Sequence, residues 1–105
     1  MLRIYETVLE VIRLLRPVIA EIRRHDPHLA DQLQDASNGV ALCMAEGSYS
    51  RGRNRHALYH RSLGSAKESG SCLDVALACG YLESIDPRIR AGLSSVCAVL
   101  YSIVT

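Results

Sequence analysis

Residues 45–82 read AEGSYSRGRNRHALYHRSLGSAKESGSCLDVALACGYL, and this stretch decides the fold. Residues 45–47 are the last part of an apolar helical pattern that ends at Gly47, and a basic loop follows. Small residues then recur in steps of four and three, which is the spacing of a helix packed lengthwise on its neighbours. Because small side chains let helix axes approach closely, we expect a central, tightly packed helix. The residues of this seam are Leu58, Ser62, Ser65, Ser69, Cys72, Ala76 and Cys79.

Apolar residues at helical spacing also occupy the segments before and after this stretch. Asp26-Pro27 and Asp86-Pro87 begin the second and fourth of these patterns. An aspartate can accept hydrogen bonds from free amides as an N-cap, and proline suits the first helical position. We therefore predict helices over about residues 2–24, 27–46, 53–79 and 87–104.

Gly47 and Gly80 follow two of these patterns and are placed as the left-handed residues that end helices. Four amphipathic helices with short connections favour an all-α fold, an antiparallel up-down-up-down four-helix bundle. No segment has the alternating pattern of a strand. With 105 residues, we expect one domain that covers residues 1–105.

The composition indicates a globular protein of the cytoplasm. The chain lacks the run of about 20 apolar residues that crosses a bilayer, and its charged N-terminus does not resemble a signal peptide. We therefore expect no contact with a membrane. No C-x-x-C motif is present, which favours free cysteines in a reducing compartment, packed as small buried apolar residues. These cysteines are Cys43, Cys72, Cys79 and Cys97.

Four blocks of the sequence resemble one known protein family. They are LADQLQDAS from Leu29 to Ser37, AEG from Ala45 to Gly47, GSAKES from Gly64 to Ser69, and LDVALACGYL from Leu73 to Leu82. In this order, the blocks are similar to those of the 23S rRNA intervening sequence protein family. One departure is Cys43, where the family usually carries an asparagine.

The resemblance implies a four-helix bundle of a kind found in small cytosolic bacterial proteins, some encoded within insertions in ribosomal RNA genes. A relative accompanies the reverse transcriptase of diversity-generating retroelements. That relative forms a five-membered ring of bundles and binds nucleic acid through a basic surface. For this chain, the resemblance implies a homo-oligomer, with a pentamer as the expected form. No catalytic residues are established for the family, so none is implied here.

Positive charge is concentrated in residues 51–67, which we call the basic segment. No acidic residue lies between Gly47 and Lys67. The segment carries +5, which leaves −4 for the rest of a chain whose net charge is +1. Guanidinium groups interleaved with aromatic rings bind phosphates and stack on unpaired bases. The candidate nucleic-acid-binding residues are Arg51, Arg53, Arg55, Tyr59, Arg61 and Lys67.

Other interpretations of the basic segment remain open. Its arginines can pair with acidic residues of a neighbouring helix or subunit, or they can bind an anionic small ligand. Two function hypotheses follow. The first is an oligomeric accessory protein that binds RNA or DNA through the basic segment. The alternative is a structural or scaffolding module that binds a protein partner and uses its arginines for subunit assembly.

Candidate catalytic and metal-binding residues are few. His56 and His60 have the spacing of two ligands on one helical face, but no motif supplies a third, so two surface histidines are the better interpretation. Glu46 and Glu68 lack the third group that acid-base catalysis requires. We therefore expect no enzyme activity, no metal site and no cofactor.

The last helix is apolar around more of its circumference than one buried face requires. Its seam carries residues such as Leu93 and Val96, yet Cys97, Val99 and Tyr101 fall outside it. We expect this helix either to be deeply embedded or to contact another subunit.

Overall fold

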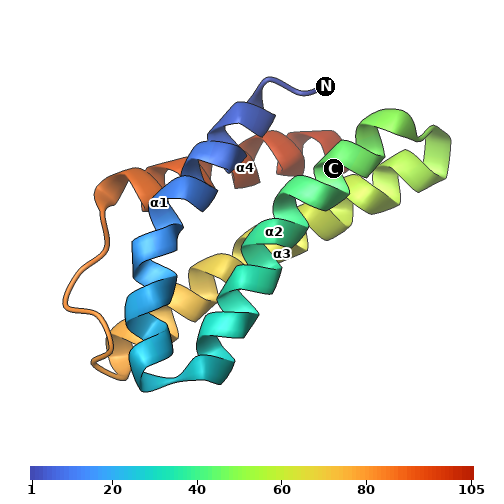
Figure 1. Ribbon diagram of the computed structural model, residues 1–105. Coiled ribbons are helices and arrows are strands. Elements are labelled where there is room, and N and C mark those ends of the chain that lie inside the picture. The colour runs from blue at the N-terminus through green and yellow to red at the C-terminus, as the bar shows by residue number, and fades with distance from the viewer.

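Four helices joined by short connections form an antiparallel bundle in the computed structural model of residues 1–105 (Figure 1). The helices are α1 (Ile4–His25), α2 (Pro27–Tyr49), α3 (Gly52–Ala78) and α4 (Pro87–Val104). Successive helices run in opposite directions. Both α1 and α3 pack against α2 and α4, so the four helices form a closed ring of neighbours. The predicted all-α, up-down-up-down four-helix bundle is confirmed.

The N-termini of α2 and α4 are capped as predicted. Asp26 Oδ1 accepts a hydrogen bond from the Leu29 amide at 3.0 Å, and Asp86 Oδ1 accepts one from the Arg88 amide at 2.9 Å. The Arg88 side chain also donates to both carboxylate oxygens of Asp86, with a shortest distance of 2.8 Å. These hydrogen bonds from Arg88, its side chain first, lower the pKa of Asp86 from its ordinary value.

Gly47 does not end the second helix, so that prediction is wrong. Helix α2 continues to Tyr49, and Gly47 is one of its buried interior residues. A Cβ atom at Gly47 would lie 2.6 Å from the Tyr59 ring. The glycine therefore serves the close packing of α2 on α3 instead of a left-handed turn. Gly80, with φ of 78°, does adopt the left-handed conformation after α3, as predicted.

Small residues bring α2 and α3 together along their length. Ser62 is fully buried, and its Oγ donates a hydrogen bond across the helix pair to the Val40 carbonyl oxygen at 2.7 Å. Gly39 lies opposite Ser65, whose Oγ would be 3.0 Å from a Cβ atom at position 39. Two residues of the predicted seam, Ser62 and Ser65, therefore lie in the contact between α2 and α3.

Aliphatic side chains fill the core, because the chain has no phenylalanine or tryptophan. The core has two clusters. The first includes Leu15, Ile22, Leu33, Leu73 and Ile89. The second, nearer the α2–α3 turn, includes Val8, Met44, Tyr59, Val96 and Leu100.

The cysteines do not all occupy the buried positions expected of them. Cys72 is buried, and Cys43 and Cys97 are half-buried, but Cys79 is exposed because it follows the last turn of α3. The apolar circumference of α4 is also only partly covered: the side chain of Tyr101 is 58% exposed. None of the helices has the length and apolar character that crossing a membrane requires.

Replacing Gly47 with alanine should destabilise the bundle, because the added methyl group meets the Tyr59 ring. Overpacking of this kind costs about 1–3 kcal/mol. Gly64→Ala is the matched control, since nothing lies within 4 Å of a Cβ atom at that helical position. It should raise the free energy of unfolding by up to about 1 kcal/mol through helix propensity. Urea unfolding followed by circular dichroism measures both, and equal stability of the two variants would contradict the Tyr59 contact.

Acid should weaken the cap of α4. The folded-state pKa of Asp86 is lowered, so the cap contributes stability above a pH of about 4 and loses it as the pH falls through the folded-state pKa. Asp86→Asn keeps a capping oxygen that does not titrate. Near neutral pH, the difference in free energy of unfolding between wild type and this variant should be constant. Below about pH 4, wild type should lose stability relative to the variant. Urea unfolding at a series of pH values tests this; a difference that persists unchanged into acid would argue against the cap.

Candidate nucleic-acid interface

The turn between α2 and α3 projects beyond the ends of α1 and α4 (Figure 1). It brings the start of the basic segment to one extremity of a molecule that measures 42 Å along its longest axis. All five of its cationic side chains are exposed. Six ion pairs form within the chain, and none of them involves a residue of the basic segment. The positive charge at this end of the molecule is therefore not neutralised within the chain.

Arg55 has a structural role in this turn. Its Nε donates to the carbonyl oxygens of Gly47 at 3.1 Å and Ser50 at 2.8 Å, and its Nη2 donates to the Ser48 carbonyl oxygen at 3.4 Å. These oxygens belong to the C-terminal end of α2, where helix carbonyls lack partners and cations are favourable. Arg55 thus caps α2, so its guanidinium is not free in the way that those of Arg51 and Arg53 are.

Tyr59 is not available to a ligand, which corrects its assignment as a candidate binding residue. Its side chain is only 6% exposed and belongs to the apolar cluster next to the α2–α3 turn. The edge of its ring rests on Gly47. A base cannot stack on a ring that is buried in this way, so the basic segment contains no exposed tyrosine of its own.

Three positive or potentially positive residues share one face of α3. Arg53, His60 and Lys67 follow one another at intervals of seven residues, which is nearly two helical turns and a rise of about 10 Å. All three are exposed. We call this row the α3 stripe. Arg61 lies about 100° further around the helix, and Arg51 precedes its first turn, so the structure does not bring all the predicted cations to one face.

A hollow of about 250 Å³ lies between α3 and the end of α4, and we call it the α3–α4 hollow. Helix α3 contributes His60 and Lys67 of the stripe, together with Leu63 and Gly64, and α4 contributes its C-terminal turn. Burial raises the pKa of the Cys97 thiol on α4, and the charge of the nearby Lys67 acts against that shift. Because His60 and Lys67 belong to the α3 stripe and also line the hollow, the stripe leads directly to this recess. Its lining residues are His60, Leu63, Gly64, Lys67, Tyr101, Val104 and Thr105.

His56 fixes one wall of this hollow. Its Nε2 lies 3.0 Å from the Val104 carbonyl oxygen and so joins α3 to the end of α4. The rings of His56 and His60 are 6.5 Å apart and tilted by 34°. No group of three potential metal-ligating side chains forms around them or elsewhere.

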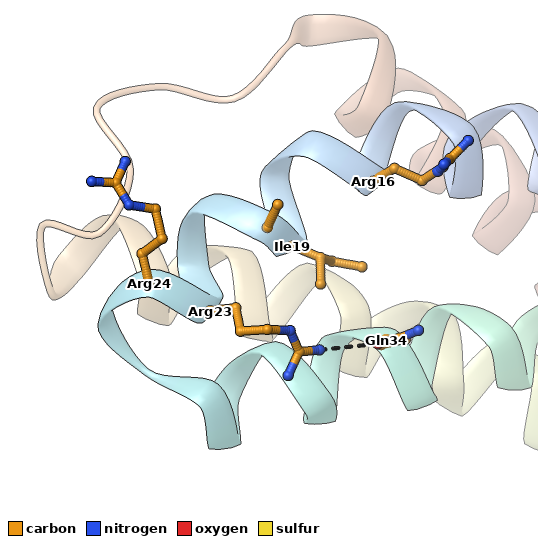
Figure 2. A pocket seen from close by; sticks show the side chains of 6 residues that line it. Arg16, Ile19, Arg23, Arg24 and Gln34 are labelled. Carbon is orange, nitrogen blue, oxygen red and sulfur yellow. Dashed lines mark hydrogen bonds between the residues drawn. The ribbon is translucent and has the colours of Figure 1, made fainter.

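A larger hollow, of about 460 Å³, lies between α1 and α2, and the sequence patterns did not indicate it (Figure 2). Arg16, Arg23 and Arg24 surround an apolar floor. Arg23 is held by Asp31 at 2.7 Å and Gln34 at 3.1 Å, and Arg24 pairs with Glu21 at 3.1 Å. Figure 2 shows the three guanidinium groups pointing in different directions. They do not converge on one anion.

Comparison with known proteins supports the fold. No protein-family model and no curated protein matches the sequence. A solved structure matches with a TM-score of 0.81 and 12% sequence identity, over 97% of this chain and 98% of the other. It is the crystal structure of a protein of unknown function from the S23 ribosomal protein family, from Bacteroides thetaiotaomicron. At this identity the likeness shows a shared four-helix fold.

Arg55 and Arg53 should respond differently to replacement by alanine. Arg55→Ala removes three hydrogen bonds to carbonyl oxygens and should lower stability by about 1 kcal/mol, or a Tm decrease of about 4–8 °C. Arg53→Ala is the control, since the Arg53 side chain has no partner in the chain, and it should change stability by less than about 0.5 kcal/mol. Thermal unfolding measures both. A larger loss for Arg53→Ala than for Arg55→Ala would refute the capping role.

Proposed function

We propose that this protein is a non-enzymatic, cytoplasmic accessory protein that binds nucleic acid as a homo-oligomer. One observation carries the proposal: the cations of the basic segment are exposed and form no ion pair within the chain, and the segment begins at the projecting α2–α3 turn. Neutralising phosphates with such cations releases counterions from the nucleic acid, which supplies most of the affinity in binding that does not depend on sequence.

The resemblance and the fold comparison support the same proposal. The sequence blocks resemble the 23S rRNA intervening sequence protein family, and the similar solved structure is described as a member of an S23 ribosomal protein family. The resemblance also suggests a five-membered ring. In a ring, the basic segments of several subunits would act together, so that weak phosphate contacts from each subunit add to one another.

Exposed apolar residues are the basis for proposing self-association. The side chains of Leu42 on α2 and Val75 on α3 are 63% and 47% exposed. Burying such residues between copies removes apolar surface from water.

The same two residues favour an alternative function, a scaffolding module that binds a protein partner. In that case the arginines of the basic segment would serve contacts between subunits, and replacing them would break the oligomer. In the nucleic-acid proposal, the oligomer survives these replacements and only the affinity for nucleic acid is lost. Sedimentation velocity of wild type and the variants described next separates the two functions, and a strictly monomeric wild type at micromolar concentration would contradict the oligomer.

The double variant Arg53→Gln/Arg61→Gln should bind mixed RNA or DNA at least about 10-fold more weakly than wild type at low salt. The slope of log affinity against log salt should decrease by about 1.4 for single strands, because each phosphate contact contributes about 0.7. Arg16→Gln/Arg24→Gln is the matched control, with the same loss of charge at the other hollow. Fluorescence anisotropy across a salt titration gives both quantities. Equal losses in the two double variants would show that net charge alone, without a defined site, accounts for binding.

A further inference from the structure

Tyr101 is the one tyrosine that the fold places beside an exposed cation, Lys67, in a recess. It comes from α4, far from the basic segment in sequence, and its side chain is 58% exposed. It lines the α3–α4 hollow together with His60 and Lys67 of the α3 stripe. The other tyrosines are half-buried, buried in the core, or exposed outside this hollow: Tyr5, Tyr49, Tyr59 and Tyr81.

Gly64 keeps the hollow open. It lies in the interior of α3, where glycine lowers helix stability relative to alanine. No packing contact requires a glycine there, because nothing lies within 4 Å of a Cβ atom at this position. Gly64 does line the hollow, one helical turn from both His60 and Lys67. A side chain at this position would project into the recess, so the absence of one leaves room for a bound group.

The shape and charge of the hollow suit one nucleotide of a flexible strand. An exposed aromatic ring offers a stacking surface to any unpaired base. Lys67 can bind the phosphate of the same nucleotide. Arg53 lies about 20 Å from Lys67 along the α3 stripe, within reach of a phosphate further along the strand. Bases inside a duplex are already stacked and paired, so they cannot enter without being flipped out at an energetic cost.

We infer that the α3–α4 hollow is a base-stacking subsite for single-stranded nucleic acid, in which an unpaired base lies on Tyr101 and its phosphate on Lys67. This inference rests on the proposed function and adds a preference to it: the protein binds single strands more tightly than duplexes of the same length. In this subsite, α4 supplies the stacking ring of Tyr101 and α3 supplies the positive charge of Lys67.

The first test compares tyrosine variants in binding to a single-stranded oligonucleotide of about ten nucleotides, labelled for fluorescence anisotropy, and to its duplex. Tyr101→Ala should weaken single-strand binding by about 5- to 100-fold and by a similar factor at low and high salt, since stacking is not a charge interaction. Tyr101→Phe should keep wild-type affinity. Tyr49→Ala is the matched control, because Tyr49 is 85% exposed but lies outside the hollow, and it should weaken binding less than Tyr101→Ala does.

The second test uses Gly64→Ala, for which stability and binding should change in opposite directions. The variant should be more stable than wild type yet bind the same oligonucleotide more weakly, because its methyl group occupies the recess. Reduced binding therefore cannot result from unfolding. A direct readout comes from Tyr101→Trp, since the wild-type chain has no tryptophan. Its fluorescence should be quenched by the single strand more strongly than that of Tyr49→Trp.

The results separate this inference from the proposed function. If wild type binds nucleic acid with a steep salt dependence but Tyr101→Ala and Gly64→Ala bind as wild type does, the stacking subsite is refuted and the proposed function stands. If wild type binds neither strand nor duplex, both are refuted. Adenosine monophosphate should compete poorly, because it lacks the neighbouring phosphates. Competition as strong as that of the oligonucleotide would overturn the assignment to a strand and assign the hollow to a free nucleotide.

Discussion

The close contact between α2 and α3 is the constraint on which the rest of the structure depends. It requires small residues at three levels: Gly39 opposite Ser65, Ser62 bonded to the carbonyl group of Val40, and Gly47 beneath the ring of Tyr59. Because the two helices stay in contact up to their shared turn, they extend beyond α1 and α4 as a supported pair (Figure 1). A loosely packed pair of this length would fray, and the charged turn at its end would have no defined position.

The same contact divides the basic segment into structural and free residues. Tyr59 is buried in the core, and Arg55 caps α2 with its Nε and Nη2 atoms. Arg53 and Lys67 face solvent along the α3 stripe, and the hollow at its end is completed by α4. The separation has a physical basis: helix ends need cations near their unpaired carbonyl groups, and the core at this end needs a large ring that no phenylalanine or tryptophan supplies.

Local patterns predicted the fold well, because its helices are amphipathic and two of them begin at Asp-Pro caps that act within a few residues. The failures involve contacts between distant residues. A glycine that ends a helix and a glycine that makes room for a ring can both follow an apolar pattern, so the prediction for Gly47 is wrong. Tyr59 is a candidate binding residue by sequence because its neighbours are basic, but its helical phase places it in the core. The α3–α4 hollow could not be predicted, since Tyr101 and Lys67 lie on different helices and meet only in the folded bundle.

Amide chemical-shift mapping during titration with a single-stranded oligonucleotide tests most directly whether the α3 stripe and the end of α4 form one interface. Shifts should be largest from Arg53 to Lys67 and around Tyr101, and they should diminish as salt is added. The residues that surround the larger hollow, Arg16, Arg23 and Arg24, should remain unshifted. The largest shifts at that hollow, or shifts of equal size over the whole surface, would contradict a nucleic-acid interface on α3 and α4.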